Sequence, residues 1–427
     1  MYLRRKKRGV ILILTLWIVT VLSLIAYSLA FEMRLEARLT KLKKDNLIAF
    51  QLAKAGMAKA VCDLKNDMVI DRAEKSQVLD AEGDIWKKAE DKFQVEMNNG
   101  TYSVHIIDEE SLIHLNEAHP LLLPAMIEYF IGEDEEEEAG KIGMAIVDWR
   151  DSDDVPVNTN EGSSERILYK KYIAKDYYDI DLEYDSSEYD IQYRLKNDKF
   201  SSVEELLDVY GIAAELFYGF DPEERKQEIM MDQTDRESEY DQHIMRTPEE
   251  ETHQWLNPEV YGLRDVLTLN STGKVNINTA GVDVLAILLS AAKVNDPDPE
   301  VVAKAIVDYR RDGSESDLDN DKAFRNVNEL AQVEGISGGQ IAAIQRIQPL
   351  TTSSTNFRII SEGRYGRAHR TIEAVVRRTW ETFNVDTTDD DFDPSVRRRI
   401  KREDEDRDDD MITVECPTVR IIQWRER

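Results

Sequence analysis

The N-terminal stretch constrains the fold of this chain more than any other part, because it carries one helical pattern that starts with a membrane-like composition. Residues 9–31 contain no charged side chain and follow five consecutive basic residues at 4–8. Read as a helix, the uncharged stretch would extend roughly 35 Å, which is enough to cross the ~30 Å hydrocarbon core of a membrane. We therefore predict a membrane-spanning helix, and the basic flank places its N-terminal end in the cytoplasm.

The helical pattern does not end where the charges begin. No proline occurs before Pro120, and after Glu32 apolar residues recur at close to helical spacing. These residues are Leu35, Leu39, Leu42, Ile48, Leu52, Met57, Ala60 and Leu64. Their spacing follows one face of a helix, so we predict a single rod over residues 10–66 that lies half in lipid and half outside it. A cleaved secretory signal would have a shorter apolar region of about 7–15 residues.

The boundary between the basic and apolar runs resembles a processing site. Residues 8–12, with Gly9 and Val10 among them, are similar to the cleavage site of type IV prepilins and pseudopilins, where a dedicated peptidase cuts after the glycine. Residues 52–57 also resemble that family. The resemblance implies that residues 1–9 are a leader removed by prepilin peptidase. It further implies that Val10, with a methylated amine, begins the mature protein.

Leu14 departs from the common pattern of this family. Most pilin-like subunits carry a glutamate at the fifth position of the mature protein, which here is Leu14. That glutamate neutralises the N-terminal amine of a neighbouring subunit in the filament. Its absence is typical of the minor pseudopilin K of type II secretion systems, so the resemblance assigns Leu14 a role in assembly.

Two parts of the chain that are far apart in sequence carry strand signals. Residues 93–97 and 102–106 alternate apolar and polar side chains around Asn99 and Gly100, a dipeptide typical of a hairpin turn. Further strands are predicted at 357–362, 370–378 and 419–424. A helix packed on a small antiparallel sheet is the pilin-like plan, so we predict an α+β fold. Its pilin-like α/β domain would comprise residues 67–108 and 350–427, with a charged, partly helical connection at 71–91.

The intervening residues 109–349 contain an internal repeat. Segments 113–118, 145–150 and 200–212 match segments 275–280, 305–310 and 324–336 in the same order. The first copy, 112–220, has a longer connection between its second and third segments than the second copy, 274–348. We therefore predict two similar units that form a large all-helical domain inserted into the sheet.

Each unit is predicted to contain three helices. The side chain of the Asn-x-Ala turn would cap the first helix by accepting from its free N–H groups. The second would end with an aromatic side chain in the core and an arginine near its carbonyl end. The third would close at a glycine in the left-handed conformation. The residues expected to be equivalent are Asn116 and Asn278, Trp149 and Tyr309 (both buried), and Phe200 and Phe324 (both buried).

The repeat also resembles the helix-hairpin-helix units of DNA-binding proteins, most closely at 275–280. In that family the turn and nearby basic residues hold a phosphate. Here the corresponding turn, 333–337, has Glu329 and Glu334 beside it, and the chain carries a formal charge of −30. Such a charge repels nucleic acid, so we interpret the repeat as a packing unit and expect no nucleic-acid partner. A membrane-anchored helix-hairpin-helix DNA-uptake protein stays open as an alternative from another class.

The same region is similar to pseudopilin K over more of its length. The resemblance covers most of the chain from Arg8 to Arg378. Its main segments are 148–154, 160–162, Tyr169, 196–197, 200–206 and 273–280. Acidic insertions depart from the family pattern and read as solvated loops. They occupy residues 133–138, 221–254 and 386–410.

The resemblance implies a non-enzymatic minor pseudopilin at the tip of the type II secretion pseudopilus. Such a protein helps initiate pseudopilus assembly and protein export across the outer membrane. It would cross the bacterial inner membrane once, with its C-terminal domain in the periplasm. Its partners would be other minor pseudopilins, inner-membrane components of the secretion system and prepilin peptidase. A minor pilin of a type IV pilus is the alternative within the same structural class.

No catalytic motif is recognised in the sequence, and the chain is expected to require no cofactor. Asp151, Asp153 and Asp154 are candidate calcium ligands, together with Asp148, because some members of the family hold calcium in this domain. Residues 317–321 contain a second run of aspartates. A solvated acidic loop is the competing interpretation of both. The two cysteines, Cys62 and Cys416, are expected to be unpaired thiols.

Overall fold

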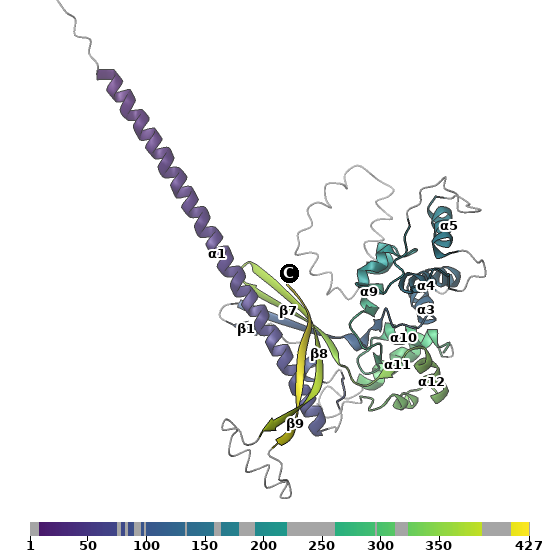
Figure 1. Cartoon of the computed structure of the whole chain (residues 1–427). Helices are drawn as coiled ribbons and strands as arrows, with labels where there is room; N and C mark the ends of the chain where they lie inside the picture. The colour runs from purple at the N-terminus through teal and green to yellow at the C-terminus, as the bar shows by residue number, and fades with distance from the viewer. Residues whose placement is uncertain are drawn as a thin grey trace, which may run out of the picture.

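The computed structural model describes most of the chain, and the elements lie as shown in Figure 1. The described residues are 8–74, 78–81, 84–88, 95–97, 100–132, 135–157, 164–178, 193–219, 261–294, 297–311, 323–386 and 411–426. Several predicted features lie outside these ranges. They are most of the leader, Asn99, the acidic segment 221–254, most of 386–410 and the aspartates at 317–321.

The N-terminal rod is one continuous helix, α1 (Arg8–Glu74), of 67 residues. It extends past the predicted end at residue 66, because its last turns also pack against the rest of the protein. Residues 12–44 are exposed, and this stretch projects away from the sheet (Figure 1). Within the described part of the chain, α1 is the one helix long and apolar enough to cross a membrane.

The second half of α1 packs on the sheet through small residues. Ala49 and Ala53 are fully buried. At Gly56 a Cβ atom would lie 2.3 Å from Oγ of Ser361, and at Gly363 it would lie 2.0 Å from the carbonyl oxygen of Ala49. Glycine at both positions lets the helix approach the strands closely. The Ser361 hydroxyl donates to the carbonyl of Ala53 at 2.8 Å, which holds the helix in register on the sheet.

Five antiparallel strands form the sheet in the order β1-β2-β7-β8-β9. The strands are β1 (Val95–Met97), β2 (Gly100–Asp108), β7 (Asn356–Tyr365), β8 (Ala368–Asp386) and β9 (Met411–Glu426). The predicted hairpin and C-terminal strands are confirmed, and the last two strands are longer than predicted. Asp108 pairs with Phe357 in the register of β2 and β7. The inserted domain therefore leaves the sheet and returns to it at neighbouring positions.

The inserted domain contains two repeats whose helices and strands follow a similar order along the chain. Repeat one has β3 (Ile113–His114), α3 (Leu122–Ile131), α4 (Glu136–Arg150), α5 (Glu165–Tyr178), η3 (Val203–Asp208), α6 (Ala214–Tyr218), α9 (Leu263–Val266) and β4 (Leu267–Thr268). Repeat two has β5 (Val275–Asn276), α10 (Val282–Ala291), α11 (Pro299–Arg311), η7 (Val327–Gln332), α12 (Gly338–Ile347) and β6 (Leu350–Thr351). The first and last strands of each repeat pair in parallel. These two-residue strands, and the 3₁₀ rather than α conformation of η3 and η7, were not anticipated from the sequence.

The predicted capping role of the Asn-x-Ala turn is wrong. Neither α3 nor α10 has a side-chain cap, and both start after the turn, at Leu122 and Val282. Instead Asn116 accepts from the backbone N–H of Phe200 at 2.8 Å and donates to its carbonyl at 2.9 Å. Asn278 makes the same pair of bonds with Phe324, at 2.9 and 3.0 Å. Each asparagine thus mimics a strand partner for a distant segment, which satisfies buried backbone groups.

The two repeats also share the contacts of the arginine at the end of their second helix. Arg150 donates to the carbonyls of Leu115 and Ala118, and Arg310 donates to the equivalent carbonyls, of Ile277 and Ala280, at 2.8 and 2.7 Å. The arginines therefore bind the Asn-x-Ala turn rather than the carbonyl end of their own helices. Gly211 and Gly335 have φ of 80° and 95°, as predicted for left-handed positions.

The aromatic pairs are equivalent in contact but not in burial. Trp149 stacks on Phe200 with ring centroids 6.4 Å apart, and Tyr309 stacks on Phe324 at 5.1 Å. Trp149 and both phenylalanines are buried as predicted. Tyr309 is only half-buried, because its hydroxyl reaches the surface and binds Gln332 at 2.7 Å. The two cysteines, Cys62 and Cys416, are unpaired.

Candidate functional site

A cluster of carboxylates lies in repeat one, where α4 ends and α5 begins. Asp148 is in the last turn of α4, Asp151 directly follows that helix, and Glu165 is the first residue of α5. One oxygen of each lies within 4.8 Å of the others. Asp148 and Glu165 are fully buried, and Asp151 is partly buried. The chain thus brings together three acids from two helices and one loop.

Hydrogen bonds fix two of these carboxylates while leaving other oxygens unused. The Tyr169 hydroxyl donates to Oδ2 of Asp148 at 2.6 Å, and the N–H of Val157 donates to Oδ1 at 3.0 Å. The side-chain amide of Asn197 donates to Oε2 of Glu165 at 3.3 Å, and the backbone φ of Asn197 is 50°. Within the described residues, Oε1 of Glu165 and Oδ1 of Asp151 are buried without a hydrogen-bond partner. Buried oxygens of this kind are costly unless a ligand or proton meets them.

The three acids hold protons more tightly than ordinary carboxyls do. Burial raises the pKa of Asp148 to about 6, although the hydrogen bonds from Tyr169 and Val157 oppose the shift. Burial, and then the neighbouring Asp148 and Asp151, raise the pKa of Glu165 to about 8. The pKa of Asp151 is raised by burial and by Asp153. The site therefore disfavours three ionised carboxylates at once, and a bound cation would stabilise their ionised forms.

The donor set fits a calcium ion. Calcium prefers carboxylate and carbonyl oxygens at about 2.3–2.6 Å, so ligands on opposite sides of one ion lie up to about 5 Å apart. The spacing of the oxygens of Asp148, Asp151 and Glu165 is within this limit. The unpartnered oxygens of Asp151 and Glu165 are the atoms left for the ion.

The cluster overlaps only in part with the ligands predicted from sequence. Asp151 belongs to it, whereas Asp153 and Asp154 are exposed and lie outside it. Glu165 was missed as a ligand. Asp148 and Glu165 are separated by a long connection, and the sequence does not show that this connection folds back. Their occurrence at the end of one helix and the start of the next was the available signal.

The residues predicted for processing and assembly all lie on α1. Gly9 and Val10 belong to its first turn. Leu14 is 60% exposed, among a run of exposed apolar side chains that continues to Phe31. This exposed apolar surface would be unfavourable in water and matches a lipid or protein environment.

The chain has few detectable similarities to other proteins. No protein-family model matches it, and no curated protein matches it in sequence. Among solved structures, it is similar to one chain of the crystal structure of the GspK-GspI-GspJ complex from the type 2 secretion system of enterotoxigenic Escherichia coli. The two chains share 14% sequence identity with a TM-score of 0.48, and the alignment covers 80% of this chain and 94% of that chain.

Proposed function

We propose that this protein is a non-enzymatic minor pseudopilin of the K class in a type II secretion system. One observation carries the proposal: a single helix whose exposed half is apolar continues into a half that packs on a small antiparallel sheet. An exposed apolar half needs a membrane before assembly and neighbouring helices after it. The subunit would cross the inner membrane once, with the sheet and the inserted domain in the periplasm.

We further propose that the subunit occupies the tip of the pseudopilus. Leu14 offers no carboxylate to the N-terminal amine of a neighbouring subunit, and a buried unpaired charge in lipid-like surroundings costs several kcal/mol. The inserted domain extends to one side of the sheet, away from the membrane-facing half of α1 (Figure 1). A domain of this size beside the stem would hinder a further subunit from stacking above it. Both features favour a position where only subunits below are contacted, and hence a role in initiating assembly.

The processing step can be tested by mass spectrometry of the mature protein. If prepilin peptidase cuts after Gly9, the mature chain begins at Val10 and carries a methylated amine. A bulky substitution of Gly9 should block cleavage while the protein still inserts in the membrane, because the apolar span is unchanged. An intact leader in the wild-type protein, or cleavage near residue 30, would exclude the pseudopilin proposal.

The tip position can be tested by co-purification from detergent extracts. We expect one copy of this protein to purify with one or two other minor pseudopilins of a type II secretion system. Recovery with type IV pilus subunits instead would favour the minor pilin alternative. Assembly of the purified protein into long homopolymers would exclude the tip position.

Calcium is proposed as a structural ion of the inserted domain, held by Asp148, Asp151 and Glu165. When bound, it would supply the positive charge that the cluster lacks. The protein residues would then do the positioning: Tyr169 and the Val157 N–H orient Asp148, and Asn197 orients Glu165. Asp148 belongs to α4, which has a counterpart in repeat two, whereas Glu165 belongs to α5 in the insertion of repeat one. The bound ion would therefore hold the insertion against the part that both repeats share.

A further inference from the structure

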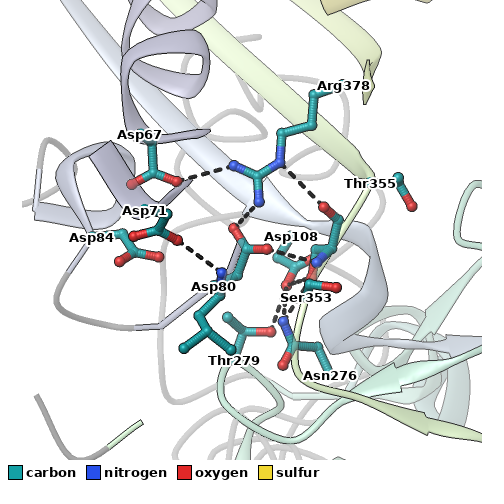
Figure 2. Close-up of polar contacts among 12 residues, drawn as sticks. Asp67, Asp71, Asp80, Asp84, Asp108, Asn276, Thr279, Ser353, Thr355 and Arg378 are labelled. Atoms are coloured by element: carbon teal, nitrogen blue, oxygen red, sulfur yellow. Dashed lines mark hydrogen bonds and ion pairs between the residues drawn. The ribbon is translucent and has the colours of Figure 1, made fainter. Parts of the chain in front are cut away.

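A second group of buried acids lies at the junction between the stem helix, the sheet and the inserted domain (Figure 2). Its members are at most 6% exposed and come from four places in the chain. They are Asp67 and Asp71 on α1, Asp80 and Asp84 between α1 and α2 (Ile85–Lys88), Asp108 at the end of β2, and Glu110 in η1 (Glu109–Ser111). We refer to these six residues as the junction cluster.

Arg378 of β8 is a buried cation that contacts the junction cluster. Its guanidinium binds Oδ2 of Asp67 at 3.0 Å, pairs with Asp80, and donates to the carbonyl of Ser354 at 3.1 Å. Its flat face lies 4.6 Å from the ring centroid of Phe357. The arginine is 1% exposed, so water contributes little to its solvation. One guanidinium therefore faces two carboxylates directly and the rest of the cluster at longer range.

The junction cluster also fastens the inserted domain to the sheet. The N–H of Ser354 donates to Asp80 at 2.6 Å, and its hydroxyl binds Oδ2 of Asp108 at 2.6 Å. The same oxygen of Asp108 is bound by the Thr279 hydroxyl at 2.5 Å, and Asn276 binds Ser354 at 2.7 Å. Asn276 and Thr279 belong to the first turn of repeat two. A continuous path of hydrogen bonds thus joins α1 to the inserted domain through the acids (Figure 2).

The residues between α1 and α2 depend on the same acids. The N–H of Leu79 donates to Asp71 at 2.8 Å, and the N–H of Ala81 donates to Asp84 at 2.7 Å. Directly after them, Trp86 of α2 is buried against Phe357, with ring centroids 5.1 Å apart. Opening of the cluster would therefore release this connecting segment as well.

Asp67, Asp80, Asp108 and Glu110 carry more negative charge than Arg378 balances if all four are ionised. Arg378 pairs with Asp67 and Asp80, whereas Asp108 and Glu110 accept from hydroxyl and backbone N–H groups. The neighbouring Glu109 is paired with its own partner, Arg358 of β7, at 2.6 Å. Burial of uncompensated negative charge is strongly unfavourable, so the folded cluster retains protons. Burial raises the pKa of Asp67 to about 7 even though Arg378 opposes the shift. Burial also raises the pKa values of Asp80, Asp108 and Glu110, and for Asp108 the nearby Glu110 and Asp80 add to it.

We propose that the junction cluster is a proton-binding device that controls how firmly the stem helix is attached to the rest of the protein. Uptake of protons holds α1, the segment before α2 and the first turn of repeat two together. Loss of protons above neutral pH leaves unbalanced carboxylates in the junction and loosens it. This inference is independent of the proposed secretion function, because it rests only on contacts within the chain.

The direction of the pH effect follows from the difference between closed and opened forms. In the opened junction the aspartates contact water and regain ordinary pKa values near 3.9. The closed junction binds protons more tightly, so acid favours the closed form. The contribution of Asp67 to closing is complete below about pH 4 and is lost as the pH rises through about 7. For this residue alone, the opening equilibrium should be about tenfold more favourable at pH 8 than at pH 6.

Hydrogen exchange of the full-length protein in detergent micelles tests the proposal locally. The amides of Leu79, Ala81 and Ser354 donate to the cluster and report its opening. After correction for the intrinsic pH dependence of exchange, we expect about tenfold more opening at pH 8 than at pH 6, with a midpoint near 7. The amides of Phe200 and Phe324, which bind the repeat asparagines, should not show this midpoint.

Two matched variants on α1 separate proton binding from general stability. Asp67→Asn mimics the protonated residue and removes the contribution of Asp67, so the change between pH 6 and 8 should be about tenfold smaller than in the wild type. Asp63→Asn is the control: Asp63 is similarly buried one turn earlier, but it pairs with Lys59 and should leave the tenfold change intact. If Asp67→Asn does not fold, the midpoint of hydrogen exchange against pH in the wild-type protein still tests the proposal.

Three results would overturn the proposal. The first is wild-type exchange at the three amides without a midpoint between pH 6 and 8. The second is a change between pH 6 and 8 in folded Asp67→Asn that is as large as in the wild type. The third is closing at pH 8 upon addition of calcium or magnesium to the Glu165→Gln variant, in which the site of repeat one lacks a ligand. That result would assign the junction cluster to a metal ion instead of protons.

Discussion

The two repeats of the inserted domain share one set of contacts, which we call the frame, yet among the described residues only the first repeat carries a candidate ligand site. In both, an asparagine binds the backbone of a phenylalanine, and an arginine binds the carbonyls of the turn that carries the asparagine. The burial of the aspartate before the aromatic residue differs between the two repeats. Asp148 is fully buried in repeat one, whereas the equivalent Asp308 in repeat two is exposed.

The difference arises from what the chain inserts after that aspartate. In repeat one, the longer connection supplies Glu165, Tyr169 and Asn197, and these side chains surround Asp148 and its neighbours. The frame itself does not change, because its own hydrogen bonds are made by other residues. A repeated unit can therefore acquire a site through an insertion at its surface without altering the contacts that hold it together.

A second insertion distinguishes the repeats at their ends. Repeat two closes with the single helix α12 before β6, whereas repeat one has the two short helices α6 and α9 before β4. Residues 220–260 lie between them. At Gly262 a Cβ atom would be 2.4 Å from the backbone nitrogen of Gly219, so the chain enters and leaves this insertion at almost one point. In the structure, residues 261–268 complete repeat one, which thus continues beyond residue 220, its end in the sequence prediction.

The largest test of the shared frame is truncation of its aromatic residues. Phe200→Ala and Phe324→Ala should each cost about 3–5 kcal/mol in the free energy of unfolding, because both rings are buried. Trp149→Ala should cost a similar amount, whereas Tyr309→Ala should cost about 1–2 kcal/mol because Tyr309 is half-buried. Urea unfolding followed by circular dichroism measures these losses. Equal losses at Trp149 and Tyr309 would contradict the difference in burial between the repeats.

Calcium should sharpen the comparison, because the acid cluster found among the described residues of the two repeats lies in repeat one. At a calcium concentration a hundredfold above the dissociation constant, the folded protein should gain about 2.7 kcal/mol. Glu165→Gln should remove this gain, and Asp308→Asn, at the position equivalent to Asp148, should keep it. Thermal unfolding with calcium or with a chelator provides the measurement. A calcium effect that survives Glu165→Gln would show that the ion binds elsewhere.

Substitution of the two asparagines tests whether the repeats depend equally on the hydrogen bonds between asparagine and phenylalanine backbone. Asn278 is fully buried, so Asn278→Ala leaves backbone groups of Phe324 without partners and should cost about 2–3 kcal/mol. Asn116 is only partly buried, and Asn116→Ala should cost about 1–2 kcal/mol because water can replace the lost bonds. Thermal unfolding of both variants, with the exposed Asn328→Ala as the control, measures the difference. A larger loss of stability for Asn116→Ala than for Asn278→Ala would contradict the difference in burial between the two asparagines.

The smallest effect is expected at the turn of repeat two that resembles a phosphate-binding turn. Glu334 is exposed, and Glu334→Ala should change the free energy of unfolding by no more than about 0.5 kcal/mol. Under the proposed function, secretion of exported proteins in cells should also be unaffected. Loss of secretion with unchanged stability would show that this turn has a role beyond packing.

Much of the fold could be predicted from the sequence because its signals are local and periodic. The uncharged run and its amphipathic continuation predict α1, and alternating side chains predict the hairpin of β1 and β2. The repeat predicts that Phe200 and Phe324 are equivalent, because matching spacing places matching residues on matching frames. Even so, the same pattern suggested helix caps for Asn116 and Asn278, since a capping asparagine and one that binds a distant backbone look alike in sequence.

The sequence by itself therefore determined the stem helix, the strands of the five-stranded sheet and the existence of two similar units. Only the tertiary structure decided which acids act together. It kept Asp148 and Asp151 in the candidate calcium site, excluded Asp153 and Asp154, and added Glu165. It also brought Asp67 and Asp80 together on Arg378. The reason is physical: periodicity specifies which face of an element is buried, whereas the charge and solvation of a carboxylate depend on groups that the chain brings from far away.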